Sequence, residues 1–130
     1  MLKYLIAIPL IMHGLAHLSG FLEAWTPLHP FAARPWLFST GVTMDTAVGR
    51  LFGLLWLVAA AGLVTAGYGL LAGHEWWPSL ALVAALLSLL AIVPWWRTVP
   101  PGAWFGALFN LVVVVTLLLP WGDQVVRFLR

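Results

Sequence analysis

Two histidines in the first long apolar stretch are the residues of this sequence best suited to chemistry. The stretch runs from Tyr4 to Glu23, with His13 near its midpoint and His17 four residues later. Residues four apart project from the same face of a helix, so we expect both imidazole rings on one stripe. An imidazole can exchange a proton or bind a metal ion. The pair is therefore a candidate for acid–base catalysis, metal binding or ligand binding.

The elements that must position these histidines are expected to be membrane-spanning helices. A spanning helix needs about 20 mostly apolar residues, and four stretches qualify: 4–24, 49–71, 77–96 and 103–120. Of the 130 residues, 63% are hydrophobic and 8% are charged, whereas a soluble domain carries about 25% charged residues. We therefore predict an all-α fold, a four-helix transmembrane bundle, with residues 1–130 as a single integral membrane domain.

Composition excludes several functional classes. The net charge of +2 comes from six Lys and Arg against four Asp and Glu, so we expect no nucleic-acid partner. The chain has no cysteine, which excludes disulfides, thiolate metal sites and cysteine redox chemistry. A secretory signal peptide is disfavoured at the N-terminus, because two histidines interrupt the apolar run and no cleavage site of small residues follows it.

One long connection, residues 25–48, joins the first and second stretches. It is rich in proline and aromatic residues, so we expect part of it to lie in the membrane interface or to fold over the bundle. We expect the second helix to begin early, near Thr43 or Asp45, which would place Arg50 at the level of the lipid headgroups.

The charge pattern leaves the orientation in the membrane open. Basic residues divide equally between the two sides: Lys3, Arg127 and Arg130 on one, Arg34, Arg50 and Arg97 on the other. The positive-inside rule therefore favours neither orientation. We expect cytoplasmic termini, because Lys3 directly precedes the first span. At the other end of the chain, Asp123 could cap a short amphipathic turn.

Tryptophans and small residues mark the ends and faces of the expected spans. Indoles anchor helices at membrane interfaces, and this role is expected for Trp25, Trp76, Trp77, Trp95, Trp96, Trp104 and Trp121. Small residues at helical spacing predict faces where membrane helices approach closely. These residues are Gly49, Gly53, Ala81, Ala84, Ser88, Ala91, Gly102 and Gly106.

Polar side chains from all four expected helices fall at one depth. His17 and Asn110 each lie seven residues inside their spans, which is about 10 Å from the same membrane face. Ser88 and Trp56 reach a similar depth from the remaining helices, and such groups usually hydrogen-bond across helices. We predict a ligand-binding pocket here that opens toward the long link. Its candidate residues in the layer are His13, His17, Trp56, Ser88 and Asn110. Glu23 and Arg50 are further candidates, which we expect above this layer at the membrane surface with His29 and Asp45.

Metal binding, haem binding and a purely structural pair are the alternatives. Two histidines at this spacing can share a transition metal, but a third ligand would have to come from Glu23, His29 or Asp45. Bis-histidine haem needs facing histidines, so we expect no haem in a monomer, although a homodimer could supply the second ligand. In the structural alternative, the pair only hydrogen-bonds to Asn110 or Ser88 and holds the helices together.

The stretch His13-Gly-Leu-Ala-His17-Leu-Ser-Gly-Phe21, followed by three further spans flanked by tryptophan, resembles a known group of membrane proteins. These are small bacterial four-span proteins with an H-G-x-x-H-L-x-G-F motif and no assigned activity. The resemblance adds weight to the two histidines as the signature of the chain. It is in keeping with a multi-pass location in the bacterial inner membrane.

Three functions of different classes follow from these residues. The first is a protein that binds a hydrophobic small molecule, a lipid or a partner subunit in a pocket lined by His and Asn. The second is a membrane enzyme that uses His13 or His17 as an acid–base group or metal ligand on a lipophilic substrate. The third is a small transporter or proton path, which the scarcity of charge inside the spans disfavours. Expected partners are the lipid bilayer and a second copy or a larger membrane complex.

Overall fold

The computed structural model describes residues 1–27, 34–96 and 103–129, and within these ranges the chain is helical, with no strand. The elements are α1 (Leu2–Ala16), α2 (Leu18–Trp25), α3 (Ala47–Ala72), α4 (Trp77–Ile92), the 3-10 turn η1 (Val93–Trp95), α5 (Ala103–Leu118) and α6 (Gly122–Leu129). His29, Arg97, Gly102 and Arg130, named above from the sequence, lie outside the described residues.

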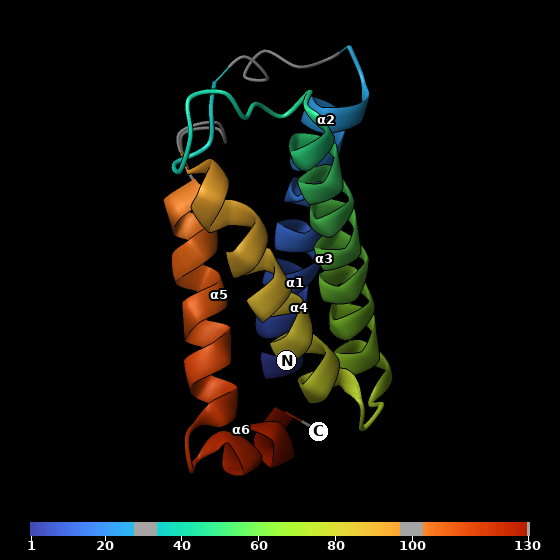
Figure 1. The fold of residues 1–130 in the computed structure, drawn as a ribbon. Coiled ribbons are helices and arrows are strands. Elements are labelled where there is room, and N and C mark those ends of the chain that lie inside the picture. Colours follow the sequence, from blue (N-terminus) through green and yellow to red (C-terminus); the bar gives the residue numbers. More distant parts are fainter. Residues whose placement is uncertain (28–33, 97–102, 130) are drawn as a thin grey trace.

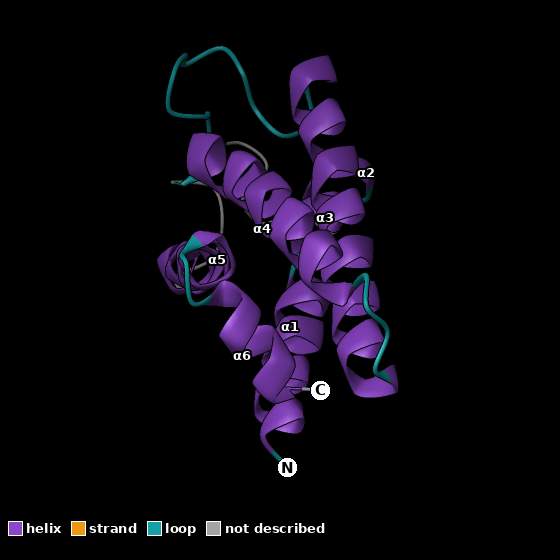
Figure 2. Ribbon diagram, turned by 90° about the horizontal axis from the view of Figure 1, so that it is seen from below, coloured by secondary structure: helices purple, strands orange, loops and turns teal. Residues whose placement is uncertain are grey.

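The long helices stand side by side (Figure 1). Helix α3 packs against α1 and α2 on one side and against α4 on the other, and α4 also packs against α5. Helix α6 leaves α5 at an angle of 100° and runs across the end of the molecule toward α1 (Figure 2). There Leu129 joins Ala7 in one apolar cluster, so the two ends of the described chain lie together.

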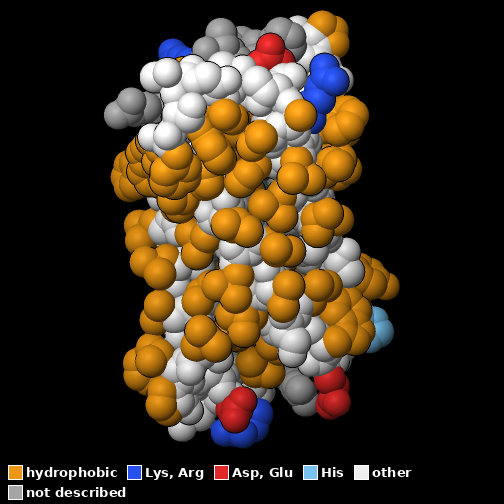
Figure 3. Space-filling model, viewed as in Figure 1, with side chains coloured by type: hydrophobic (Ala, Val, Ile, Leu, Met, Phe, Trp, Pro, Cys, Tyr) orange, Lys and Arg blue, Asp and Glu red, His pale blue; other side chains and the backbone are white. Residues whose placement is uncertain are grey.

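Three helical segments are long and apolar enough to cross a membrane: Leu2–Trp25, Ala47–Ala72 and Trp77–Trp95. They match the first three predicted spans to within two residues. Helix α5 ends two residues earlier than predicted and has 16 residues, so it reaches spanning length only if the bent pair α5–α6 counts as one span. Figure 3 shows hydrophobic side chains over the middle of the molecule, with the charged ones at its two ends.

The hydrogen bonding of the first span changes at His17, where α1 passes into α2, while the backbone of His17 stays in the right-handed helical region with φ −65° and ψ −20°. The backbone N–H of His17 lies 3.1 Å from the Gly14 carbonyl oxygen and 3.3 Å from that of His13. The His17 side chain also donates to the His13 carbonyl through Nδ1, at 2.9 Å. A side chain that bonds to the carbonyl four residues back competes with the helical N–H, which tightens or bends the helix.

Both ends of α3 have recognisable caps. The Thr46 side chain accepts from the Gly49 N–H, and an N-cap threonine supplies an acceptor that the first helical turn lacks. The helix therefore begins at Ala47, later than the expected start near Thr43 or Asp45. At the other end Gly73 adopts a left-handed conformation with φ 74°, which glycine permits without strain. Lys3 donates from Nζ to the Leu71 carbonyl at 3.1 Å.

The interfacial role expected for the paired tryptophans is wrong for one member of each pair. Trp77 and Trp95 are 3% and 0% exposed, whereas their neighbours Trp76 and Trp96 are more than two-fifths exposed. Adjacent residues on a helix point about 100° apart, so one indole of each pair faces the surface and the other the interior. Trp25, Trp104 and Trp121 are each about half exposed, as an interfacial anchor requires.

The small residues do mark the close helix contacts. Ala81, Ala84, Ser88 and Ala91 form a stripe on α4 that is at most 1% exposed. Gly53 of α3 lies against α2, where an added Cβ would come within 2.5 Å of the Ala24 Cβ. At Gly14 of α1 an added Cβ would lie 3.0 Å from both the Ala60 carbonyl oxygen and the Val64 nitrogen of α3. Backbone atoms of a packed helix cannot yield locally, so α1 and α3 depend on Gly14 for their approach.

Gly14→Ala should therefore destabilise the protein, by about 1–3 kcal/mol as for other overpacked positions. The measurement is the thermal unfolding midpoint in detergent. Gly41→Ala is the matched control, because the nearest atom to an added Cβ there is the Ser39 Oγ at 3.8 Å. Equal midpoints for the two variants would contradict the close approach of α1 and α3.

Candidate functional site

Four polar side chains from three helices meet in the interior. His13 and His17 belong to the first span, Ser88 to α4 and Asn110 to α5. His17, Ser88 and Asn110 are at most 1% exposed, while His13 is partly exposed. The prediction that polar groups from these helices share one layer is confirmed; that they bind a ligand stays a prediction.

The hydrogen bonds in this layer form a chain with one consistent direction. A carbonyl oxygen only accepts, so His17 donates from Nδ1 to the His13 carbonyl, and in the uncharged ring Nε2 must then accept. The donor to that nitrogen is the Ser88 hydroxyl, at 2.5 Å. Ser88 Oγ in turn accepts from Asn110 Nδ2 at 2.5 Å. Asn110 Oδ1 accepts from His13 Nε2 at 3.1 Å. Every donor in the chain therefore faces an acceptor.

The two histidines are not equivalent in this arrangement. His17 uses both ring nitrogens within the protein. His13 uses Nε2, and within the described residues its Nδ1 has no hydrogen-bond partner. The two rings meet edge to face with centroids 4.6 Å apart. On its far side His13 faces Gly106 of α5, where an added Cβ would lie 2.8 Å from the His13 Cε1. His13, rather than His17, is thus the residue that retains an available ring nitrogen.

Trp56 borders the polar layer through its ring. Its centroid lies 5.0 Å from that of His17, and the side chain is 3% exposed. The ring also packs against Gly20 of α2, where an added Cβ would overlap it. The glycine of the first-span motif therefore makes room for this indole, a role that the sequence alone did not indicate.

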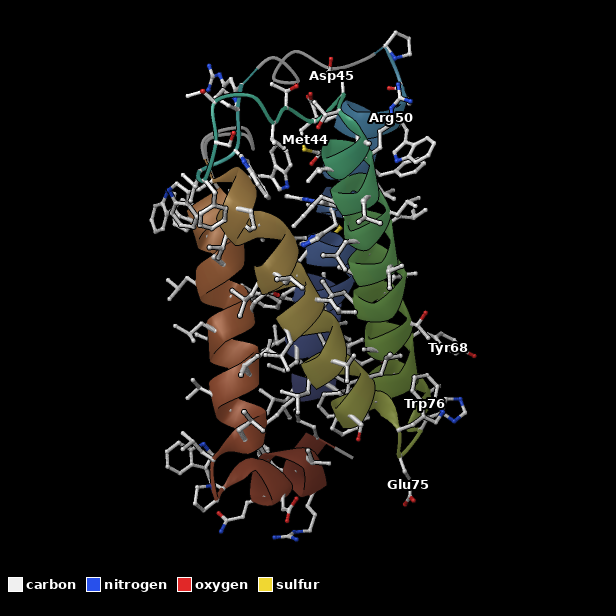
Figure 4. All side chains as sticks on the ribbon, viewed as in Figure 1. Met44, Asp45, Arg50, Tyr68, Glu75 and Trp76 are labelled. Carbon is white, nitrogen blue, oxygen red and sulfur yellow. The ribbon has the colours of Figure 1, made fainter. Side chains whose placement is uncertain are left out.

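Glu23 and Arg50 lie above the polar layer, as predicted, but in a groove that is separate from the histidines. Together with Asp45 they line this groove at the link end of the molecule; Figure 4 labels Asp45 and Arg50 there. The Arg50 guanidinium lies 6.0 Å from the Trp25 ring, and the Trp25 indole donates to the Arg50 carbonyl at 3.0 Å. Arg50 is exposed, which agrees with the headgroup level expected for it. These two residues are not part of the His–Ser–Asn chain.

An apolar cavity of about 140 Å³ lies on the other side of the polar layer, between α1, α4, α5 and α6. Its walls include Leu10 of α1, Ala81 of α4, Val113 of α5 and Leu129 of α6. Phe109 is shared between the two places, because it lines the cavity and its ring lies 5.0 Å from that of His13. Sequence reasoning missed Phe109, since nothing distinguishes it from the other phenylalanines before the helices are packed.

The described residues of this layer do not form a group of metal ligands. Within residues 1–27, 34–96 and 103–129, no group of three or more His, Asp or Glu side chains is arranged to hold a metal ion. His29, one of the ligands considered above, lies outside these ranges. The arrangement is instead suited to joining three helices through neutral hydrogen bonds.

Comparisons of this chain with protein-family models, with curated proteins and with solved structures gave no match. The site therefore has to be interpreted from its own geometry.

The direction of the hydrogen-bond chain predicts opposite tautomers for the two histidines. His17 should carry its proton on Nδ1, because that atom faces a carbonyl oxygen, and His13 should carry its proton on Nε2, facing the Asn110 oxygen. Nitrogen chemical shifts of ¹⁵N-histidine-labelled protein distinguish the two forms. Finding the proton on Nε2 of His17 would contradict the assigned direction.

Removing the Ser88 hydroxyl should break two of the hydrogen bonds in the polar layer. In Ser88→Ala the His17 Nε2 loses its donor and the Asn110 amide loses its acceptor. We expect a loss of about 1–3 kcal/mol, the usual cost of leaving buried polar groups unpaired, and more than the average of about 0.6 kcal/mol for a hydrogen bond in a bilayer. The measurement is reversible unfolding in mixed micelles. Ser79→Ala, at an exposed position of the same helix, should leave the stability unchanged, and equal effects would disprove the role of Ser88.

Proposed function

We propose that this chain is a multi-pass membrane protein in which α1 with α2, α3, α4 and α5 form a four-helix transmembrane bundle. The apolar belt between two charged ends supports this proposal. Helix α5 is about 24 Å long at 1.5 Å per residue, somewhat shorter than the hydrocarbon core of about 30 Å. Helix α6 extends it in the interface: Val125 and Leu129 face the helices, while Asp123 and Arg127 are exposed.

Within this bundle we propose a binding function for a hydrophobic small molecule or a lipid chain. The observation that carries the proposal is the apolar cavity of about 140 Å³ lined by Phe109, whose ring in turn lies 5.0 Å from that of His13. The cavity is partly open, because its wall includes the exposed side chains of Leu5, Ile6 and Val112, and an apolar space of this volume can hold a ring the size of benzene. The cavity therefore suits a small ring or a short segment of an acyl chain.

The polar chain then has a definite part in the binding function. It fixes α1, α4 and α5 relative to one another through His13, Ser88 and Asn110. These helices are three of the four that wall the cavity. A satisfied polar network specifies one packing arrangement, so it can keep the cavity open where apolar contacts alone would let the helices close.

A membrane enzyme acting on a lipophilic substrate is the second candidate, and one observation favours it. The Nδ1 atom of His13 has no hydrogen-bond partner within the described residues, and His13 adjoins the Phe109 wall of the cavity. A general base must lie within hydrogen-bond reach of the proton that it removes. In this proposal His13 is the acid–base residue, and His17 acts through it as a positioning residue.

Filling the cavity should displace whatever it binds. Val113→Phe adds a ring to the cavity wall, so the variant should retain much less of any hydrophobic molecule that co-purifies with the protein. The measurement is mass spectrometry of an organic extract from equal amounts of folded protein. Val115→Phe is the control, because Val115 lies on the same helix with its side chain exposed. Equal ligand content in the wild type and both variants would refute binding in this cavity.

A four-span bundle places both termini on one side of the membrane. The chain has no cysteine, so single cysteines at positions 3 and 128 can be labelled without background. Both positions should react, or both be protected, when intact cells are treated with a membrane-impermeant maleimide. Opposite results at the two positions would show an odd number of spans.

A further inference from the structure

The groove at the link end of the molecule carries charge of both signs. It has a volume of about 370 Å³, and its walls include Glu23 and Trp25 of α2, Asp45 just before α3 and Arg50 in the first turns of α3. Neither the hydrogen bonds of the polar layer nor the apolar cavity near α6 uses these side chains. The groove is therefore a second place with its own chemistry.

Arg50 is the basic group of this groove, and its guanidinium has no ion pair or hydrogen bond with any described residue. The neighbouring backbone is fixed, because the Arg50 N–H donates to the Thr46 carbonyl at 2.8 Å and the Arg50 carbonyl accepts from the Trp25 indole at 3.0 Å. The guanidinium itself lies 6.0 Å from the centre of the Trp25 ring. Its donors are thus available to a ligand, and a planar guanidinium is well suited to a phosphate group.

The acidic groups on the same groove call for a cation as well. The Asp45 side chain is exposed, and one of its oxygens accepts from the Thr43 hydroxyl. A carboxylate has about four acceptor sites, so Asp45 can accept from a further donor. Glu23, which is 8% exposed, adds a second acidic group. Because the groove combines two acidic side chains with one basic side chain, it favours a ligand that carries an ammonium group beside its phosphate over a purely anionic one.

The depth of the groove in the molecule points to a lipid. Asp45 and Arg50 lie at the charged end beyond the apolar belt (Figures 3 and 4), and the half-exposed Trp25 indole is typical of the headgroup level. Residues four apart share one face of a helix, so Leu54 and Val58 continue the stripe of α3 that begins with Arg50. Their side chains are 41% and 55% exposed. A phosphate at Arg50 would therefore have an apolar surface for its acyl chains directly below it.

We propose that this groove binds the headgroup of phosphatidylethanolamine. Arg50 donates to the phosphate oxygens, Asp45 and Glu23 accept from the primary ammonium, and the acyl chains follow Leu54 and Val58. Phosphatidylcholine has methyl groups in place of the ammonium N–H donors, and phosphatidylglycerol has no cation for the carboxylates. The proposal rests on the membrane bundle proposed above, but not on ligand binding in the cavity near α6.

The experiment measures lipid binding by native mass spectrometry of the delipidated wild-type protein in dodecyl maltoside. The probes share the same acyl chains and differ only in the headgroup: phosphatidylethanolamine, its N-methyl and N,N-dimethyl derivatives, phosphatidylcholine and phosphatidylglycerol. We expect the affinity to fall with each N–H that a methyl group replaces. Phosphatidylcholine and phosphatidylglycerol should each bind roughly tenfold more weakly than phosphatidylethanolamine, the equivalent of hydrogen bonds to a charged group.

Two variants separate the contacts with the phosphate and with the ammonium. Arg50→Gln should weaken phosphatidylethanolamine and phosphatidylcholine alike, by roughly three- to tenfold, because both lipids carry the phosphate. Asp45→Asn should weaken phosphatidylethanolamine more than phosphatidylcholine and so reduce the preference between them. Arg127→Gln is the matched control, because it removes an exposed arginine from α6 at the other end of the molecule, and it should leave both affinities unchanged.

Three results would overturn the proposal. One is equal affinity of the wild-type protein for all five headgroups. Another is tight binding of glycerophosphoethanolamine, which lacks acyl chains, at the same concentration as the lipid, since this would indicate a soluble ligand. Both are observed without any variant, so they hold even if a variant fails to fold. The third is unchanged affinity in both Arg50→Gln and Asp45→Asn. The membrane bundle itself is tested separately, by the cysteine labelling at positions 3 and 128.

Discussion

The closed chain of hydrogen bonds through His13, Asn110, Ser88 and His17 is the constraint on which the rest of the interior depends. Each of these groups would be costly to bury alone, because an apolar interior offers no water to replace a lost partner. Together they satisfy one another, and the three side-chain-to-side-chain bonds each join two different spans. These hydrogen bonds thus fix the relative depth of α1, α4 and α5, which apolar side chains in a bilayer define poorly.

That constraint also bears on the change in hydrogen bonding within the first span. His17 bonds to Ser88 through Nε2 and to the His13 carbonyl through Nδ1, and the latter shares its acceptor with the backbone N–H of His17. The change in backbone hydrogen bonding between α1 and α2 therefore accompanies the hydrogen bonds of the polar layer. Gly20, a turn later, then accommodates the Trp56 ring beside His17.

The two sides of the polar layer differ in chemistry. Toward α6 the space between the helices is apolar and partly unfilled, and Phe109 in its wall lies beside His13. Toward the link it is aromatic and rich in hydrogen-bond donors, with Trp95 fully buried. This polarity is a property of the packed helices, since the sequence places tryptophans at both ends of the third span.

The sequence by itself determined the helices, their approximate ends and the depth of the polar residues, because these depend on local hydropathy and on the rise per residue. It therefore placed His17, Ser88 and Asn110 in one layer. Only the tertiary structure decided which residues face one another, because rotation about each helix axis is set by packing between helices. That rotation buried Trp77 and Trp95 and exposed Trp76 and Trp96. It also left His13, not His17, with an available nitrogen.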